Sequence, residues 1–331
     1  MLVIRTPFRL PLGGGGSDLP AYYEKYGGKL ITAAVNKYMF ISLNQPAIVN
    51  KIKINYNRTE VVDPEQIEDI QHELVREALK WLDFRRPLEI SSMADLSAGT
   101  GMGSSSAYTV GLWKGLNTLL RRDLGTQQLA EDACRIEIER AGKPIGKQDQ
   151  YAAAYGGILA MDIDRDGTVH PRPLQLESEV VAELEHRLLM FYTGIQRDAN
   201  VILAEQGQKV AVSEEEATRG MHEIKRIGEE IGAALTAGDL DAFGGLMHRH
   251  WTVKKTISSK MSDPTIDAWY DLALRSGALG GKLMGAGGGG FLLFCAAPGR
   301  RRELREALCG AGLRFMDFRF DWEGSKVLVN F

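Results

Sequence analysis

The chain has 331 residues, of which 44% are hydrophobic and 25% charged, the ordinary balance of a globular protein large enough for two domains. Its formal net charge is -3 and it contains no long basic run, which argues against a nucleic-acid-binding protein. The apolar stretch at residues 1–5 is too short for a signal peptide, and no apolar run approaches the roughly 18 residues of a membrane span. We therefore expect a cytoplasmic protein without membrane partners.

The first predicted element is a strand that begins at residues 2–4 and leads into four successive glycines, residues 13–16, followed by Asp18. Four glycines in a row form either a flexible loop or an ordered stretch of backbone that a ligand approaches closely. Apolar residues before the run and two tyrosines after it favour the ordered alternative.

The next segments predict a sheet and a helix. Residues 29–35, 38–43 and 48–56 are rich in β-branched and aromatic side chains, which is typical of strands. Residues 64–82 repeat apolar side chains at spacings of three and four, which predicts one amphipathic helix. Residues 88–92 predict a further strand.

That strand leads into residues 97–107, Ser-Ala-Gly-Thr-Gly-Met-Gly-Ser-Ser-Ser-Ala, which precede a helical apolar pattern. Glycines at alternate positions, Gly99, Gly101 and Gly103, let backbone N–H groups converge on an anion. The serines that follow can cap the helix, whose N-terminal dipole favours the same negative charge. The alternative is a Gly/Ser turn that only caps a buried helix.

Two familiar phosphate-binding motifs do not match this loop. A Walker A loop needs a lysine directly after its glycines, and none occurs between Ser97 and Lys114. A dinucleotide fingerprint needs an acidic residue that closes a second strand, whereas Asp123 follows the predicted helix. If residues 97–106 bind phosphate, they therefore belong to another class of loop. We call them the phosphate-binding loop after this expected role.

A second helix is expected from about residue 127 to 140, and its acidic end, with Glu137 and Glu139, precedes the loop Gly-Lys-Pro-Ile-Gly-Lys-Gln-Asp-Gln at residues 142–150. Charged residues at a helix end are most often solvated, and Asp149 could be a simple hydrogen-bonding group of the loop. The combination of the phosphate-binding loop with a glutamate ten residues before Asp149, Glu139, favours a catalytic role for Asp149.

The second half of the chain is more helical. A strand is expected at residues 188–192, and helices at 213–235, 239–250 and 263–276. Residues 279–295 predict a strand, a glycine loop and a strand, so the Gly-x-Gly-x-x-Gly spacing at 285–290 lacks the helix of a dinucleotide site. No His-Arg-Asp or Asp-Phe-Gly follows, as a protein kinase would require. A helix at 300–309 and a hairpin between 315–320 and 326–331 complete the prediction.

The thiols and imidazoles suggest no metal centre. Three cysteines, odd in number and widely spaced, lie in apolar surroundings and are expected to be buried free thiols: Cys134, Cys295 and Cys309. Three histidines without neighbours at ligand spacing are interpreted as structural or surface residues: His222, His248 and His250.

The three glycine segments, with the Asp149 loop between the second and third, resemble in type and order the motifs of the GHMP kinases, a family of small-molecule kinases. The resemblance covers nearly the whole chain. It implies an α+β fold of two domains, an ATP-binding ribosomal-S5-like domain at residues 1–180 and a ferredoxin-like domain at 181–331, with the active site between them.

The resemblance also implies roles for individual residues. Asp149 matches the catalytic aspartate, Arg9 the basic residue near the transferred phosphoryl group, and Ser105 with Glu139 the Mg²⁺ ligands, although the register among the three serines stays open. ATP would bind the following residues: Ser97, Gly99, Gly101, Gly103, Ser104, Ser105 and Ser106. The acceptor would bind the following residues: Gly15, Gly16, Asp18, Gly287, Gly288 and Arg197.

Within the family, the N-terminal region resembles the bacterial D-glycero-D-manno-heptose 7-phosphate kinases, which phosphorylate the anomeric hydroxyl and serve surface polysaccharide synthesis. Such an acceptor needs a second basic site, for which Arg197 and Lys143 are candidates, whereas Lys147 is interpreted as loop charge. A kinase for an unphosphorylated sugar such as fucose or galactose, and a non-catalytic sugar or ATP sensor, stay open. The joint presence of all the matched catalytic and metal residues argues against a sensor. The sequence does not predict the oligomeric state.

Overall fold

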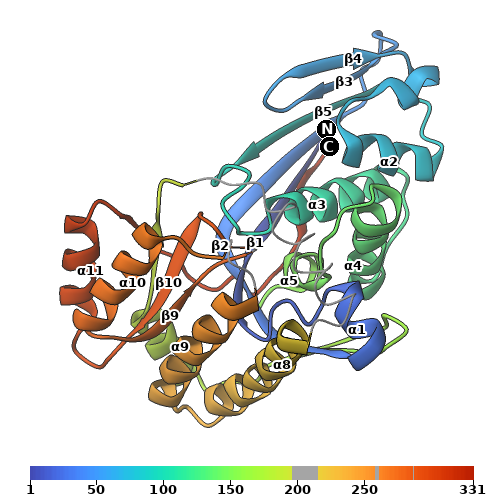
Figure 1. Cartoon of the computed structure of the whole chain (residues 1–331). Coiled ribbons are helices and arrows are strands. Elements are labelled where there is room, and N and C mark those ends of the chain that lie inside the picture. Colours follow the sequence, from blue (N-terminus) through green and yellow to red (C-terminus); the bar gives the residue numbers. More distant parts are fainter. Residues whose placement is uncertain (196–214, 258–260, 286) are drawn as a thin grey trace.

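The computed structural model describes residues 1–195, 215–257, 261–285 and 287–331, which form two sheets with helices packed around them (Figure 1). The larger sheet is organised by β2 (Gly28–Asn44), a strand of 17 residues. One side of β2 pairs along its length with β1 (Leu2–Gly13). On the other side its first part pairs with β6 (Ile158–Ile163) and its last part with β5 (Leu88–Ala94).

The order of the larger sheet is β12-β1-β2-β5-β3-β4, with β6 and β7 branching from β2. All pairs are antiparallel except that of β3 with β5. The remaining strands are β3 (Ile52–Asn55), β4 (Thr59–Val62), β7 (Val169–Pro173) and β12 (Lys326–Asn330).

The helix that follows the phosphate-binding loop, α3 (Ser104–Leu119), lies directly on β1 and β2. Two glycines on its inner face allow this approach, because a Cβ at Gly115 would lie 2.7 Å from Cδ1 of Ile4 and one at Gly111 would lie 2.7 Å from Oγ1 of Thr6. The sheet thereby fixes the position of the loop at the helix N-terminus.

The other helices of this domain cover the same sheet or connect its strands. They are α1 (Pro20–Tyr26), η1 (Pro64–Asp69), α2 (Glu73–Leu82), α4 (Thr126–Cys134), η2 (Arg135–Arg140) and α5 (Gln148–Tyr155). The single helix predicted at residues 64–82 is wrong, because Ile70 adopts an extended backbone that separates η1 from α2.

The smaller sheet has the order β11-β8-β10-β9 and is wholly antiparallel. Its strands are β8 (Leu188–Tyr192), β9 (Ala278–Leu283), β10 (Phe291–Ala296) and β11 (Arg314–Met316). Its helices are α6 (Ser178–Arg187), α8 (Glu215–Thr236), α9 (Leu240–Ile257), α10 (Pro264–Arg275) and α11 (Arg301–Gly310). Along the chain, β8 is followed by helices, then by β9 and β10, then by α11 and β11. Numbered in this chain order, the four strands lie in the spatial order 4-1-3-2, which is a ferredoxin-like topology. The predicted two-domain α+β fold is thereby confirmed.

Helix α8 joins the two domains. It packs against β1 and β2, and Gly228 lies so close to Gly14 that a Cβ there would come within 2.8 Å of the Gly14 Cα. Figure 1 shows α8 beside α9, which packs against β9 of the smaller sheet. The glycine run at residues 13–16 is therefore an ordered part of the domain junction.

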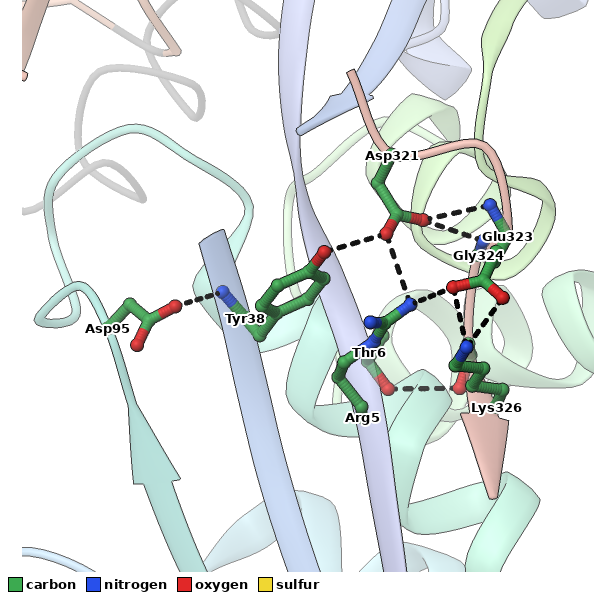
Figure 2. Close-up of polar contacts among 9 residues, drawn as sticks. Arg5, Thr6, Tyr38, Asp95, Asp321, Glu323, Gly324 and Lys326 are labelled. Carbon is green, nitrogen blue, oxygen red and sulfur yellow. Dashed lines mark hydrogen bonds and ion pairs between the residues drawn. The ribbon is translucent and has the colours of Figure 1, made fainter. Parts of the chain in front are cut away.

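The C-terminal strand corrects the hairpin prediction, since β12 pairs with β1 and places the two chain termini together (Figure 1). Figure 2 shows the polar network that anchors the preceding segment. The carboxylate of Asp321 accepts hydrogen bonds from Arg5 at 3.2 Å and from the Tyr38 hydroxyl at 2.9 Å, and Thr6 contacts Ser325 at 2.9 Å. The chain thus returns to the first domain after the boundary predicted at residue 181.

Burial of the thiols differs from the expectation at one position. Cys134 and Cys295 are buried and free, but Cys309 is exposed, because α11 turns its neighbour Leu308 to the core. Within the described ranges, no helix combines the length and apolarity of a membrane span.

Candidate active site

The centre of the candidate site is an ion pair between Arg9 on β1 and Asp149 at the start of α5, with 2.6 Å between Nε and Oδ1. Arg9 also donates a hydrogen bond to the carbonyl of Gly101, and its backbone N–H donates to the carbonyl of Met102 at 3.1 Å. The two side chains are 7% and 20% exposed. Burial raises the pKa of the Asp149 carboxyl, and the charge and hydrogen bond of Arg9 oppose that shift.

The phosphate-binding loop adopts the conformation that its glycines suggest. Gly99, Gly101 and Gly103 have φ angles of 77°, 75° and 75°, a left-handed region that residues with a Cβ rarely adopt. A Cβ at Gly103 would lie 2.9 Å from Oδ2 of Asp149. The loop therefore ends at the N-terminus of α3 in direct contact with the ion pair.

The third glycine segment packs on the phosphate-binding loop. A Cβ at Gly101 would lie 2.7 Å from the carbonyl oxygen of Met284, and one at Gly285 would lie 2.8 Å from the Gly101 Cα. Gly287 and Gly288 lie against Met261, to whose carbonyl the Gly288 N–H donates at 3.1 Å. This segment supports the loop, and the predicted acceptor contacts of Gly287 and Gly288 stay predictions.

The structure places Ser105 beside Glu137 and not beside Glu139, the residue that was expected to share a Mg²⁺ ion with it. The Ser105 hydroxyl donates to Oε1 of Glu137 at 2.6 Å, and Gln150 donates to Oε2 at 2.6 Å. Burial raises the pKa of the Glu137 carboxyl, while hydrogen bonds from Ser105, Ser106 and Gln150 oppose the shift. Glu139 is exposed and lines a separate cavity with Lys147, because side chains two positions apart on a helical turn point to different faces.

A sequence signal for Glu137 was present but was missed. Ala130, Ala133, Cys134 and Glu137 follow the spacing 0, 3, 4, 7 of one helix face, and all four are buried. An acidic residue on the apolar face of a helix is buried only where it has a partner, and that position distinguishes it from Glu139.

On the other side of the ion pair, Asp18 is held by two loops. Its carboxylate accepts hydrogen bonds from the backbone N–H of Gly16 at 2.9 Å and from the backbone N–H of Gln148 at 3.1 Å. The Gln148 side chain donates to the same carboxylate at 3.2 Å, and a Cβ at Gly146 would overlap it. Asp18 is therefore fixed beside Asp149 by residues of the same segment that carries Asp149, residues 142–150.

Asp18 and the ion pair line one cavity between the domains, which we call the acceptor cavity. Its volume is about 70 Å³, so any ligand larger than a few water molecules could enter only if the lining side chains moved apart. The first domain contributes Arg9, Pro11, Gly15, Gly16, Asp18, Leu19, Ile145, Gly146, Gln148 and Asp149. The second contributes His250, Lys254, Lys282, Leu283 and Gly285.

Three side chains of the second domain had no expected role at this cavity. His250 was interpreted as a structural or surface residue, Lys282 begins the third glycine segment, and Lys254 was not singled out. Of the two cations that were expected near the acceptor, Arg197 lies outside the described residues. Lys143 pairs with Glu73 at 2.5 Å and lines a different cavity.

That second cavity, of about 710 Å³, adjoins the outer side of the phosphate-binding loop and is lined by Ser97, Ser104 and Ser105. Aromatic side chains form part of its wall, with the rings of His72 and Tyr108 stacked at 4.7 Å. A planar ligand attached to a phosphate in the loop would have room here.

Metal ligands are sparse in the described part of the chain, which contains no group of three or more His, Cys, Asp or Glu side chains placed to hold an ion. A Mg²⁺ ion that bridges phosphate groups needs only one or two protein oxygens. The fully buried Glu137 carboxylate has no ion-pair partner among the described residues and lies against the Ser105 hydroxyl. Glu137 and Ser105 therefore fit such an ion.

Comparisons with known proteins agree with this geometry. The model "GHMP kinases N terminal domain" matches residues 71–157, and "GHMP kinases C terminal" matches residues 232–312. A D-glycero-alpha-D-manno-heptose 7-phosphate kinase from Campylobacter jejuni is 32% identical over 97% of both chains.

Solved structures are similar over both domains. The crystal structure of a D-glycero-D-manno-heptose 1-phosphate kinase from Bacteroides thetaiotaomicron has a TM-score of 0.83 and 27% identity over 100% of both chains. A putative sugar kinase from Campylobacter jejuni has a TM-score of 0.77 and 29% identity, covering 98% of this chain and 97% of its own.

Proposed function

This chain belongs to the GHMP kinase family, and we propose that it is an ATP-dependent sugar kinase that phosphorylates the anomeric C1 hydroxyl of D-glycero-D-manno-heptose 7-phosphate. The observation that carries this proposal is the Arg9–Asp149 ion pair, because it lies between the phosphate-binding loop and a cavity that contains Asp18. The similar protein that is named a heptose 7-phosphate kinase supports this choice of acceptor. The one named a heptose 1-phosphate kinase supports a heptose phosphate as the acceptor class.

Asp149 would accept the proton of the attacking C1 hydroxyl. The C1 oxygen forms a bond to the γ-phosphorus of ATP while the bond from that phosphorus to the β–γ bridging oxygen breaks, which gives ADP and the 1,7-bisphosphate. The carboxylate that burial makes more basic is a suitable proton acceptor. Arg9 would pair with the moving phosphoryl group, whose negative charge is spread over its equatorial oxygens.

The phosphate-binding loop would hold the triphosphate through its backbone N–H groups and its serine hydroxyls, at Ser97, Gly99, Gly101, Gly103, Ser104, Ser105 and Ser106. The base of ATP would enter the 710 Å³ cavity beside the loop. A Mg²⁺ ion, when bound, would neutralise charge on the β- and γ-phosphate oxygens. Ser105 and Glu137 would hold that ion, in place of the expected Ser105 and Glu139.

Asp18 would accept hydrogen bonds from sugar hydroxyls, since its carboxylate is already oriented by Gly16 and Gln148. Gly15 and Gly16 would let the sugar approach the backbone at the same wall of the cavity. An acceptor held there presents one hydroxyl to Asp149, which defines the regiochemistry of the transfer.

An ADP-release assay with ATP and Mg²⁺ tests the proposal against a panel of acceptors: D-glycero-D-manno-heptose 7-phosphate, mannose, galactose, fucose, homoserine and mevalonate. Turnover with the heptose phosphate alone, with a new anomeric phosphate in the ³¹P NMR spectrum of the product, is the expected result. Turnover with a free sugar instead would favour an unphosphorylated acceptor. Binding of ATP without turnover of any acceptor would favour a sensor.

A further inference from the structure

We infer that Lys254, Lys282 and His250 form a dedicated anion site in the acceptor cavity, which binds the phosphate group that the sugar already carries. This inference rests on the proposed function for its ligand, and it concerns residues to which the sequence analysis gave no ligand-binding role. Its evidence is a pair of buried, uncompensated cations beside an unpartnered imidazole.

The three side chains come from two elements that pack together. His250 and Lys254 lie one turn apart on the same face of α9, and Lys282 projects from β9, on which α9 packs. All three line the acceptor cavity together with Arg9 and Asp18. They are 1%, 8% and 3% exposed, respectively, so water does little to solvate their charges.

The two lysines lack counter-charges. Lys254 donates a hydrogen bond only to the carbonyl of Gly285, at 3.1 Å, and Lys282 makes no hydrogen bond or ion pair with any residue that the structure describes. The nearby carboxylates are engaged elsewhere, since Asp149 pairs with Arg9 and Asp18 accepts N–H groups of Gly16 and Gln148. Burial of an unpaired ammonium group is costly, so the cavity favours a bound anion.

Burial and mutual repulsion leave their mark on the free protein. Desolvation, together with the charge of Arg9, lowers the pKa of Lys254 to about 8, and desolvation with the charge of Lys254 lowers the pKa of Lys282 well below its usual value. Both ring nitrogens of His250 are buried without a hydrogen-bond partner among the described residues. An imidazole N–H and two ammonium groups are a suitable donor set for a phosphate.

The site belongs to the acceptor and not to ATP because of what else lines the cavity. Asp18, Gly15 and Gly16 contribute to its wall, whereas no described residue of the phosphate-binding loop does. A sugar whose reacting hydroxyl lies at Asp149 would extend into this cavity and bring a distal phosphate to the second domain. Recognition of the acceptor would therefore require both domains.

The test compares two acceptors in matched variants. Lys254→Met and Lys282→Met each replace a lysine with an uncharged side chain of similar length. Lys255→Met is the control, because Lys255 follows Lys254 on α9 but points outward, with its Nζ 3.0 Å from Oδ1 of Asp267. Steady-state kinetics at saturating ATP are measured with D-glycero-D-manno-heptose 7-phosphate and with the unphosphorylated heptose. We expect the preference for the phosphorylated acceptor, expressed as a ratio of kcat/KM values, to fall about 10- to 100-fold in the two test variants, mainly through KM.

Equal losses with both acceptors would overturn the inference, because they would assign the lysines to the transferred phosphoryl group. An unchanged preference would overturn it as well. Removal of an uncompensated buried charge should leave the thermal midpoint equal or higher, which distinguishes these outcomes from loss of folding. Circular dichroism measures that midpoint, and Lys254→Arg, which keeps the charge, should retain more of the preference than Lys254→Met.

A binding measurement separates this inference from the proposed function. Inorganic phosphate is titrated into the protein with ADP present to fill the nucleotide site, and the thermal midpoint is followed. We expect phosphate to raise the midpoint of the unmodified protein and of Lys255→Met but not of Lys282→Met. If this occurs while no sugar phosphate is turned over, the anion site is supported and the proposed acceptor is wrong. If heptose phosphate is turned over but inorganic phosphate stabilises every variant equally, the proposed acceptor is supported and the anion site is wrong.

Discussion

The Ser105 hydroxyl lies 2.6 Å from Oε1 of Glu137, a carboxylate that is wholly removed from water. If this pair holds Mg²⁺, Glu137→Gln should lower kcat about 100-fold or more and raise the Mg²⁺ concentration needed for half-maximal activity, because the amide cannot supply the anionic oxygen that Mg²⁺ prefers. A Mg²⁺ titration of ADP release at saturating substrates measures both quantities.

Glu139→Gln is the matched control, since it makes the same change two residues away on an exposed side chain. Its activity and Mg²⁺ dependence should stay within about twofold of the unmodified protein, as expected for surface substitutions. A larger effect at Glu139 than at Glu137 would restore the metal assignment that the sequence motif suggested.

The ion pair leads to a second prediction. Asp149→Asn should lower kcat about 10²- to 10⁴-fold, the usual contribution of a positioned general base. The Kd for ATP, measured by calorimetry, should change little, because Asp149 contacts the loop but does not line the nucleotide cavity. Asp166→Asn, at an exposed turn, is the control and should retain full activity. Near-normal turnover of Asp149→Asn would contradict a role of the Asp149 carboxylate in the mechanism.

A third prediction concerns the close contact between Gly146 and Asp18. Gly146→Ala places a Cβ where the Asp18 carboxylate now lies, so Asp18 must move from the position set by Gly16 and Gln148. The KM for the acceptor should rise about tenfold or more, while the KM for ATP stays nearly constant. Gly125→Ala, where a Cβ meets no atom within 4 Å, controls for the substitution itself; parallel changes in both KM values would contradict a role in acceptor binding alone.

Much of the fold was predictable because local patterns and the order of glycine segments agree. The strand expected at residues 188–192 has the same bounds as β8, and a helix was expected directly after the phosphate-binding loop, where α3 lies. The GHMP kinase family and the two-domain α+β fold are confirmed. The hairpin at the C-terminus was wrong because strand pairing depends on partners far apart in sequence, and β1 offers β12 a longer edge than residues 315–320 do.

The site was predictable only where it coincides with a local motif. Arg9, Asp149 and Ser105 lie in glycine-containing segments, and the structure brings them to one place. Lys254 resembles an ordinary lysine in the sequence, and Lys282 begins the third glycine segment without an expected role of its own. Nothing local indicates that α9 and β9 turn both side chains inward to the same cavity. Their significance comes from burial without a carboxylate partner, which is a property of the tertiary structure.

The network around Asp321 predicts a specific loss of stability (Figure 2). Asp321→Ala removes the acceptor of hydrogen bonds from Arg5, Tyr38 and the backbone N–H groups of Glu323 and Gly324. The Tyr38 hydroxyl and the two backbone N–H groups would lose their acceptor, and Arg5 would keep only Glu323 as an acceptor among the described residues. This should lower the free energy of unfolding by about 2–4 kcal/mol, measured by urea denaturation.

Glu323→Ala is the control for the same network. Its side chain also contacts Arg5 but is 55% exposed, so solvent screens the interaction and the loss of stability should be clearly smaller. Equal losses in the two variants would indicate that Asp321 contributes only surface charge and that pairing of β12 with β1 anchors the C-terminus by itself.

The lowered pKa of Lys254 gives the last prediction. In the free protein this group loses its charge as the pH rises through about 8, whereas the sugar phosphate, with a second pKa near 6, stays a dianion. The KM for the phosphorylated acceptor should therefore rise between pH 7 and pH 9, while the KM for the unphosphorylated heptose should not. Arg9, Lys282 and His250 also face Lys254, and the Asp18 carboxylate partly offsets the positive charge of this group. A bound dianion favours the charged form of both lysines, so its binding near pH 8 should raise their pKa values, and the protein should take up protons. Calorimetry in buffers of different ionisation enthalpy measures that proton uptake. If no protons are taken up, or if the rise in KM persists in Lys254→Met, the pH dependence belongs to another group.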